Sequence, residues 1–582
     1  MNYLDNINSP QDLKKLSMEQ LPELAAEIRR TLIDRISATG GHLGPNLGMV
    51  EATIALHYVF DSPKDKFVFD VSHQCYTHKI LTGRKDGFTD PAHFGDYSGY
   101  TNPDESEHDL FMVGHTATSV SLATGLAKAR DLNGGKENIV AIIGDGSMSG
   151  GEAFEGLNNA AVLNSNMIIL FNDNEMSIAE NFGGMYQNFA ELRRMKGKAE
   201  CNFFKSFGFD YYYVEDGNDT RQLVPVFQKV KDTTRPTVIH IHTLKGKGVE
   251  WAEKDKEGGH YAFPAGFDMA AFAGAESYDS ITSEFLLKKM EKDPSVIAIS
   301  PATALQTGLP MDFRKKAGRQ YIDVGIAEEH AVAFASGLAK NGAKPVLLAI
   351  SSFMQRTYDQ LMQDLALNSS PATILVFLGN LSLGDATHCG IFDISMMSNI
   401  PGLVCLAPAT KEEYLAMLDW SIEQTSVPVV IRVPSAVVSC KNTAGLTEAD
   451  FYRYQTVEKG SRVALMGLGN FFGLAGQVKE LLKERTGIEA TVINPRIYSA
   501  LDHEMLESLK TDHRVVVTLE DGSVSGGFGE KIARFYGNSD MRVLNFGGEK
   551  MFTDRMPMEE QYARFHLTPE LIVEDIQRCM EG

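Results

Sequence analysis

The chain has 582 residues, of which 43% are hydrophobic and 23% charged, as in ordinary globular proteins. Domains usually span about 100–200 residues, so this length predicts several domains with separate cores. The formal net charge of −21 excludes broad nucleic-acid binding, because a phosphate-binding surface needs a basic stripe. Small anionic substrates are not excluded, since a few local cations or helix N-termini can bind them.

Cysteine usage and hydropathy predict the compartment. The six cysteines are far apart and form no CxxC pair, which argues against a disulfide framework or a zinc site. The N-terminal MNYLDNINSPQDLKKL has no apolar core of a signal peptide. No apolar run approaches the roughly 18–20 residues that a membrane span needs. We therefore expect a cytoplasmic protein that binds neither membrane nor nucleic acid.

Short apolar runs rich in Val and Ile alternate with helical patterns along the chain. The expected strands, in order, are 67–71, 138–143, 167–171, 237–242, 345–350, 373–378, 427–433, 463–467, 490–493 and 514–519. Uninterrupted apolar strands are typical of parallel sheets with helices on both faces. Repeated β–α alternation therefore predicts α/β layers with right-handed crossovers.

The alternation of strand and helix patterns is absent from two passages, 252–280 and 435–460. We therefore divide the chain into three expected domains, 1–270, 271–445 and 446–582. Each is expected to be a mostly parallel sheet flanked by helices. In the third domain, the glycines at 522–529 precede an expected helix and could bind an anion. A structural and dimerising role for this domain is the favoured interpretation.

The first domain contains IIGDGSMSGG at 142–151, where a strand is expected to run into Gly144, Asp145 and Gly146. A second strand runs into NDNEMSI, which places Asn174 29 residues after Asp145. Carboxylate and amide oxygens suit Mg²⁺, which commonly also takes phosphate oxygens. Ligands usually bind at the carboxyl ends of strands in open α/β sheets, so the pair of motifs predicts a metal and diphosphate site. GDG alone would be an ordinary strand-to-helix turn.

The second domain contains YIDVGIAEEH at 321–330, followed by an alanine-rich helical pattern. Glu328 and Glu329 are candidate catalytic carboxylates. Adjacent helical residues point in different directions, so at most one of them is expected to face a ligand. An acidic pair is also favourable at a helix N-terminus for structural reasons alone. Phe353 follows another expected strand and offers an aromatic surface for a planar ring.

These motifs together resemble a known group of enzymes. DVGIAEEH, FMQRTYDQ at 353–360 and the GDG–NDNEMS pair are similar to the transketolase superfamily of thiamine diphosphate enzymes. The segments 40–60, 69–84 and VGHTATS at 113–119 resemble more closely the 1-deoxy-D-xylulose-5-phosphate synthase family. The similarity runs from about residue 30 to the C-terminus. It implies a transketolase-like thiamine diphosphate-binding fold with a transketolase-like C-terminal domain, and a homodimer.

The resemblance also implies cofactors, a reaction and site residues. The cofactors are thiamine diphosphate and Mg²⁺, and the reaction is the condensation of pyruvate with glyceraldehyde 3-phosphate, which releases CO₂ and gives 1-deoxy-D-xylulose 5-phosphate. The metal ligands are Asp145, Asn174 and the carbonyl of Met176. The catalytic residues are Glu328, which activates the cofactor, and the histidines His42, His260 and His388 near the reacting carbons. The cofactor-binding residues are His73, Gly114, His115, Gly144, Gly146, Ser147, Asn174, Phe353 and Arg356.

The chain departs from the family where the acceptor's phosphate is expected to bind. Ile350 stands at a usual tyrosine, Phe377 and Pro103 stand at usual arginines, and Arg432 alone remains of an arginine pair. Arginine forks make bidentate phosphate contacts that Ile and Phe cannot replace. Either Arg432 and other groups bind the same substrate phosphate, or the acceptor is a different aldehyde.

Three further alternatives stay open from the sequence. The chain could be a transketolase, which uses ketose donors and releases no CO₂. It could be a 2-oxo acid dehydrogenase E1-type enzyme, although no lipoyl-docking segment is visible. A catalytically dead homologue is the third alternative, and the intact Asp145, Asn174 and Glu328 count against it. The segment after NDNEMSI is also shorter than is usual in the family.

Overall fold

The computed structural model describes residues 2–267, 276–439 and 445–581. The expected domain cut after residue 270 and Cys440 lie outside these ranges, and the cut after residue 445 adjoins the second gap. The chain divides into two compact units, Met1–Ala273 with Gly325–Ala327, and Gly274–Val324 with Glu328–Gly582.

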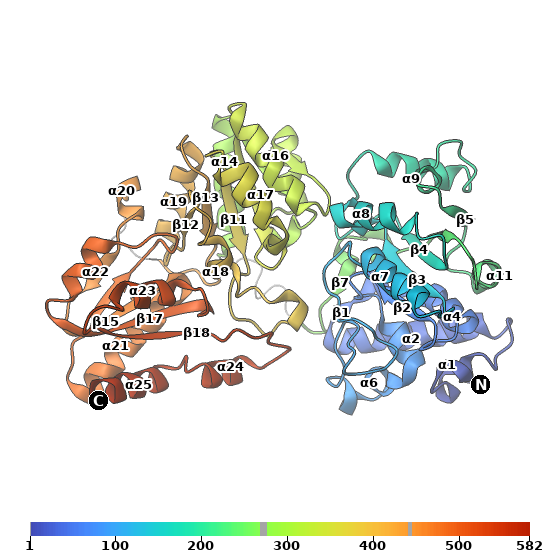
Figure 1. The fold of residues 1–582 in the computed structure, drawn as a ribbon, viewed down its shortest axis with the longest axis horizontal. Coiled ribbons are helices and arrows are strands. Elements are labelled where there is room, and N and C mark those ends of the chain that lie inside the picture. Colours follow the sequence, from blue (N-terminus) through green and yellow to red (C-terminus); the bar gives the residue numbers. More distant parts are fainter. Residues whose placement is uncertain (1, 268–275, 440–444, 582) are drawn as a thin grey trace. The chain divides into compact units, whose positions relative to one another are not determined.

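The first unit is built on a five-stranded parallel sheet, blue to green in Figure 1. The strand order is β2-β3-β4-β6-β5. The bounds are β2 Lys66–Phe69, β3 Ile139–Gly144, β4 Met167–Asp173, β5 Asp210–Val214 and β6 Pro236–His242. A short antiparallel pair joins β1 (Gly41–His42) to β7 (Tyr261–Ala262).

The helices of this unit cover both faces of the sheet. Their bounds are α1 Pro10–Leu13, α2 Leu21–Thr39, α3 Leu43–Gly48, α4 Val50–Val59, α5 Tyr76–Lys79, α6 Asp86–Thr89, α7 Ser119–Leu132, α8 Gly151–Ala160, α9 Met185–Arg194, α10 Phe203–Ser206, α11 Thr220–Val230 and α12 Glu250–Lys254. In β3, Val140 and Ile142 pack into a core with α2, α4 and α11. Ile139 and Ile143 pack into a second core with α7, α8 and α9. Because successive side chains enter opposite cores, the strand reads as an uninterrupted apolar run.

The second unit contains two further sheets. The six-stranded sheet has the order β12-β13-β11-β10-β8-β9, and its paired strands are parallel. The bounds are β8 Val296–Ser300, β9 Tyr321–Asp323, β10 Lys344–Ile350, β11 Thr373–Phe377, β12 Val404–Leu406 and β13 Val429–Arg432. The helices packed with it are α14 Tyr278–Lys292, α15 Met311–Ala317, α16 Glu328–Lys340, α17 Tyr358–Gln360, α18 Asp393–Met397 and α19 Lys411–Glu423.

The five-stranded sheet has the order β14-β16-β15-β17-β18, and β14 runs antiparallel to β16 at one edge. The bounds are β14 Gln455–Glu458, β15 Arg462–Gly467, β16 Thr491–Asn494, β17 His513–Ser523 and β18 Arg542–Gly548. The helices of this part are α20 Glu448–Phe451, α21 Phe472–Thr486, α22 His503–Leu509, α23 Phe528–Tyr536, α24 Met558–Arg564 and α25 Pro569–Glu581.

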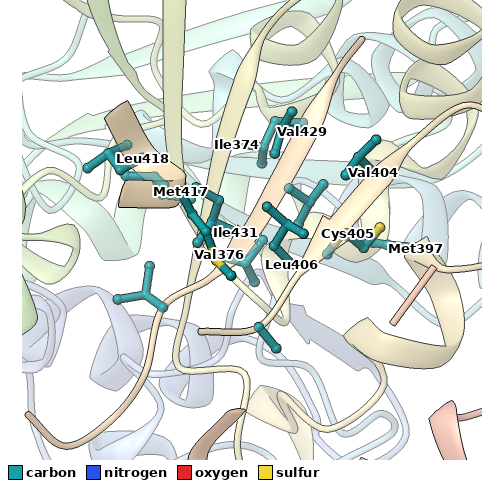
Figure 2. Packing of buried hydrophobic residues seen from close by; sticks show 14 of the residues in the cluster. Ile374, Val376, Met397, Val404, Cys405, Leu406, Met417, Leu418, Val429 and Ile431 are labelled. Carbon is teal, nitrogen blue, oxygen red and sulfur yellow. The ribbon is translucent and has the colours of Figure 1, made fainter. Parts of the chain in front are cut away.

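A continuous core supports the six-stranded sheet. Figure 2 shows Val376 of β11 and Ile431 of β13 close to Met417 and Leu418 of α19. All four side chains are fully buried. Burying each contributes roughly 1.5–3 kcal/mol relative to exposure in water, so this core holds the strand ends in fixed positions.

The predicted fold class is confirmed: the sheets are mostly parallel and flanked by helices. Each expected strand overlaps an observed one. Strands β5, β8, β9, β12, β14 and β18 and the β1–β7 pair are not among the expected ones. Most of them are short, or carry half-buried side chains, as in DYYYV of β5. Strand β8, VIAIS, is a buried apolar run like the expected strands, and its omission has no such explanation. The described cysteines are all free, and no helix in the described ranges is long and apolar enough to cross a membrane.

Candidate active site

The predicted metal ligands follow two neighbouring strands of the first unit. Gly144 ends β3 and pairs with Asn172 of β4. The backbone N–H of Asp145 donates to the carbonyl of Asn172 at 3.0 Å. Asn174 follows directly after β4. The parallel register therefore places Asp145 and Asn174 at the same edge of the sheet.

Asp145 is almost fully buried, at 1% exposure. Its Oδ2 accepts a hydrogen bond from Nδ2 of Asn181 at 2.7 Å, whereas its Oδ1 accepts none from the described residues. Burial, and then the neighbouring carboxylate of Asp173, raise the pKa of Asp145 well above its ordinary value. A cation at Oδ1 would offset the cost of burying this charge, so the residues present fit Mg²⁺.

The loop after β4 is folded tightly against the GDG segment. A Cβ on Gly146 would lie 2.6 Å from Cβ of Ser177, so only glycine fits there. A Cβ on Gly144 would meet no described atom within 4 Å, which leaves room for a ligand at this strand end. Oδ1 of Asn174 accepts from the backbone N–H of Met176 at 3.1 Å. Ser147 lies in the 3₁₀ turn Gly146–Ser149 that begins beside Asp145.

Lys245 is a buried cation beside these ligands that the motifs did not indicate. Its Nζ donates to the carbonyl of Ser177 at 2.6 Å, and the residue is 2% exposed. Burial lowers the pKa of Lys245 to about 8, against the opposing influence of Asp145. The signal available in the sequence was a lysine three residues after the end of β6 at His242.

The structure brings three of the four predicted catalytic and cofactor histidines of the first unit into contact. The ring centroids of His42 and His73 lie 5.0 Å apart, and those of His42 and His260 lie 5.6 Å apart. His73 and His260 stack at 5.3 Å. The β1–β7 pairing produces this cluster, because it sets residues 41–42 beside residues 261–262.

Two features set the protonation and the backbone positions of this histidine cluster. Burial, followed by the positive charge of Lys245, lowers the pKa of His260 well below its ordinary value, so His260 stays neutral at pH 7. Nδ2 of the fully buried Asn46 donates to the carbonyls of both His42 and His73 at 2.7 Å. Asn46 thereby fixes the backbones of two histidines that are distant in the sequence.

The fourth histidine, His115, lies with Gly114 in the loop that precedes α7. Oγ of Ser72, next to His73, donates to the carbonyl of Val113 at 2.7 Å. This bond joins the two segments that are predicted to contact the diphosphate.

In the second unit, the structure distinguishes the two adjacent glutamates. Glu328 is buried at the start of α16, whereas Glu329 is half-buried. Burial raises the pKa of Glu328 to about 7, although Arg356 opposes the shift. Oε2 of Glu328 accepts no hydrogen bond from the described residues and lies 3.8 Å from Nη1 of Arg356.

Phe353 and Arg356 lie in the 3₁₀ turn Phe353–Thr357 that follows β10. His388 lies in the turn Ala386–His388 after β11, and its ring centroid is 5.7 Å from that of Phe353. Burial alone would raise the pKa of Asp385, but the neighbouring His388 and the hydrogen bonds from Thr387 lower it to about 2. Nδ1 of His388 lies 3.6 Å from Oδ1 of Asp385 and 2.8 Å from Oγ1 of Thr387, so the Thr387 hydroxyl, which is itself bonded to Asp385, holds the ring beside this carboxylate.

Arg432 is held by carboxylates of its own chain. It is 3% exposed, and its Nε donates to Oδ2 of Asp393 at 2.7 Å. Its Nη1 forms a second ion pair with Asp521, and its Nη2 donates to the carbonyl of Asp521 at 3.3 Å. These contacts do not support the predicted role of Arg432 in binding a substrate phosphate, because two anions already neutralise it.

The segment between β18 and α24 packs along the His388 loop, and no sequence motif indicated this. The backbone N–H of Ala386 donates to Oδ1 of Asp554 at 3.2 Å. The backbone N–H of Arg555 donates to the carbonyl of Gly384 at 3.0 Å. The third part of the chain therefore contributes to the surroundings of His388.

The glycines at 522–529 lead into α23, as expected. Glu520 is fully buried, and its carboxylate accepts the backbone N–H groups of Phe528 and Gly529, both at 2.8 Å. The helix N-terminus is thus capped by the protein's own carboxylate. This favours the structural interpretation of the loop over anion binding.

Comparison with known proteins gives family matches along most of the chain. Residues 4–202 and 192–243 match the family described as 1-deoxy-D-xylulose-5-phosphate synthase. Residues 277–439 match the transketolase pyrimidine binding domain, and residues 453–572 match the transketolase C-terminal domain.

Two similar relatives are both named 1-deoxy-D-xylulose-5-phosphate synthase. The protein from Symbiobacterium thermophilum is 38% identical, over 98% of this chain and 93% of its own. The protein from Desulforudis audaxviator is 37% identical, over 98% of this chain and 97% of its own. Among solved structures, a transketolase from Pichia Stipitis covers 96% of this chain and 97% of its own at 17% identity, with a TM-score of 0.45. The chain belongs to the 1-deoxy-D-xylulose-5-phosphate synthase family of transketolase-like enzymes.

Proposed function

We propose that this enzyme catalyses the thiamine diphosphate- and Mg²⁺-dependent condensation of pyruvate with glyceraldehyde 3-phosphate. The products are 1-deoxy-D-xylulose 5-phosphate and CO₂. Family membership over nearly the whole chain supports this transferase activity. The observation that carries it is the carboxyl of Glu328, which is buried, has a pKa of about 7 and has an oxygen that accepts no hydrogen bond from the described residues.

The residues of the first unit are the proposed metal and diphosphate site. Asp145, Asn174 and the carbonyl of Met176 would hold Mg²⁺. His73, the Gly114–His115 segment and the Gly144–Ser147 turn would bind the diphosphate. The open space beside Gly144 and the single hydrogen bond that the Asp145 carboxylate accepts from the described residues support this assignment. Lys245 would add a positive charge beside the metal ligands.

The residues of the second unit are the proposed activating site. When bound, thiamine diphosphate supplies a nucleophilic carbon and the electron sink for decarboxylation. Because its pKa is about 7, Glu328 can both donate and accept a proton at a pyrimidine ring nitrogen near neutral pH. Phe353 would stack on the ring, and Arg356 would keep the Glu328 side chain in place.

The histidines are proposed to serve the substrates. His260 is neutral at pH 7, so it can accept a hydrogen bond from one group and donate one to another. His42 and His260 would bind pyruvate and move protons at its oxygen atoms. His388, held beside Asp385 through the Thr387 hydroxyl, would act on the acceptor aldehyde.

A second candidate function keeps the pyruvate chemistry but uses a different aldehyde, without phosphate. The ion pairs of Arg432 with Asp393 and Asp521 favour it, because they occupy the one arginine retained from the family's pair. Ile350 and Phe377 carry no charge that could replace it.

Assembly and domain division are part of the same proposal. The partners are small molecules, and the enzyme is a homodimer, as the family resemblance implies. The division into domains 1–270, 271–445 and 446–582 is supported by one large sheet in each range.

The experiment supplies purified enzyme with Mg²⁺, thiamine diphosphate, pyruvate and a panel of aldehydes with and without phosphate. CO₂ release and the ketose product are followed. We expect CO₂ and 1-deoxy-D-xylulose 5-phosphate with glyceraldehyde 3-phosphate. CO₂ release only with unphosphorylated aldehydes would select the second candidate, and no CO₂ with any aldehyde would contradict both. The variant Glu328→Ala, with Glu329→Ala as the matched control, separates enzymatic turnover from background.

A further inference from the structure

Asp70 is a buried carboxylate at the carboxyl end of β2, three residues before His73. It is 1% exposed. Its Oδ1 accepts the backbone N–H of Ala117 and its Oδ2 accepts that of Ser119, both at 2.9 Å. Its own N–H donates to the carbonyl of Ile142 in β3 at 2.8 Å. One residue therefore connects the central sheet to the loop that carries Gly114 and His115.

The backbone on both sides of this connection is strained. Val71 has φ 58°, Ser72 has φ 66° and Ala117 has φ 74°, and none of them is glycine. Non-glycine residues in this left-handed region cost free energy and persist only when surrounding contacts hold them. The Asp70 carboxylate bonds directly to the N–H of Ala117, and the Asp70 carbonyl accepts the N–H of Ser72 at 2.5 Å.

A neighbouring side chain strengthens the same connection. Oγ of Ser72 donates to the carbonyl of Val113 at 2.7 Å and accepts the N–H of Thr101 at 2.9 Å. The segments around His73 and His115 are thus joined by several hydrogen bonds that all start within residues 70–72. Each carboxylate oxygen of Asp70 accepts a backbone N–H of the loop, so we expect Asp70 to act through the loop rather than on a ligand.

We propose that Asp70 is a positioning residue for the cofactor. It fixes residues 113–119 relative to His73, so that both segments present their groups to the diphosphate. This inference rests on the proposed function. Hydrogen-bonded partners behind metal ligands are commonly worth about 10–100-fold in metal affinity or activity, and we expect a support of similar size for the diphosphate-binding segments.

The test is Asp70→Asn, which keeps the size of the side chain but turns one acceptor into an NH₂ group that faces a backbone N–H. Asp65→Asn is the matched control. Asp65 precedes β2 at its other end, is 3% exposed, and its carboxylate also accepts two backbone N–H groups, of Asn138 at 2.7 Å and Asp61 at 2.8 Å. The two variants therefore make the same chemical change at opposite ends of one strand.

Isothermal titration of thiamine diphosphate with Mg²⁺ gives the affinity, circular dichroism checks the fold, and thermal unfolding midpoints measure stability. We expect Asp70→Asn to weaken cofactor binding by at least about tenfold and Asp65→Asn to keep the affinity within about twofold of wild type. The thermal unfolding midpoints of the two variants should fall by similar amounts. At saturating cofactor, kcat of Asp70→Asn should return to within about threefold of wild type. Should Asp70→Asn fail to fold, Asp70→Glu, which displaces the carboxylate by one methylene, takes its place with the same expected loss of affinity.

Unchanged affinity in the folded Asp70 variant would overturn the inference, and so would an equal loss in Asp65→Asn, because the effect would then be general destabilisation. Wild-type enzyme that binds thiamine diphosphate but releases no CO₂ from pyruvate would refute the proposed reaction. The comparison of affinities would still test the positioning role of Asp70. Wild-type enzyme that does not bind thiamine diphosphate would overturn both.

Discussion

Oε2 of Glu328 lies 3.8 Å from Nη1 of Arg356 in an otherwise desolvated position at the start of α16. The separation is too long for a strong hydrogen bond, so the arginine only partly offsets the cost of burial. The carboxyl therefore keeps a pKa of about 7 and exchanges its proton near neutral pH.

Replacing Glu328 with Gln removes the exchangeable proton and keeps the shape of the side chain. We expect turnover of pyruvate to fall by about 10²–10⁴-fold, which is the usual contribution of a positioned acid–base group. Glu329→Gln, one residue along the same helix and half-buried, should retain wild-type turnover. Initial rates of CO₂ release measure the effect, and comparable rates in the two variants would refute the assignment of Glu328.

Stability should depend on pH through the same group. The pKa of Glu328 is raised from an ordinary 4.5 to about 7, so the folded protein binds this proton more tightly than the unfolded chain does. The contribution to the free energy of unfolding is complete below about pH 4.5 and is lost as the pH rises through about 7. Without cofactor, the urea midpoint of wild type should therefore fall relative to that of Glu328→Gln between pH 5 and pH 8. A constant difference between the two proteins would show that Glu328 does not titrate in this range.

Arg432 should prove structural. Arg432→Met leaves Asp393 and Asp521 buried without their cation, and removing one partner of a buried ion pair costs about 3–5 kcal/mol. We expect a lower unfolding midpoint, and partial recovery when Asp393→Asn and Asp521→Asn are added. The KM for the aldehyde should change by less than about threefold in the recovered triple variant. A large rise in KM that is confined to phosphorylated aldehydes would instead assign Arg432 to the phosphate.

Asp145 should link metal binding to stability. In wild type, Mg²⁺ with thiamine diphosphate should raise the thermal midpoint, because binding to the folded state adds RT ln(1 + [L]/Kd). Asp145→Asn should abolish most of this rise, since an amide oxygen carries no full charge for the metal. The same variant without ligands should be at least as stable as wild type above neutral pH, because it no longer buries a carboxylate whose pKa is raised. A full ligand-induced rise in the variant would place the metal elsewhere.

Some parts of the site could be predicted because their signals are local. Asp145 and Asn174 each follow an apolar strand directly, so strand recognition alone places both at one sheet edge. Most of the buried core strands are predicted for the same reason, although β8, with the apolar sequence VIAIS, is not. Strands such as β5 and β9 were not, because their side chains are half-buried and their sequences lack apolar runs.

Other parts depend on segments that are distant in the sequence. Helical spacing alone does not choose between Glu328 and Glu329; the family resemblance selects Glu328, and its burial at the start of α16 is consistent with that choice. The motif around the retained arginine, Arg432, predicts a role at the substrate. The ion pairs with Asp393 of α18 and Asp521 of β17 depend on packing between distant segments, which the motif does not encode.

The amino-acid sequence by itself determined the family, the cofactor motifs and the parallel α/β architecture, because these follow from short runs of residues and their spacing. The tertiary structure decided how those residues are used. The β1–β7 pairing assembled His42, His73 and His260, and Asp70 joined two distant loops. Burial and hydrogen bonding between remote segments set the protonation state and the orientation of these side chains. No local sequence pattern encodes such contacts.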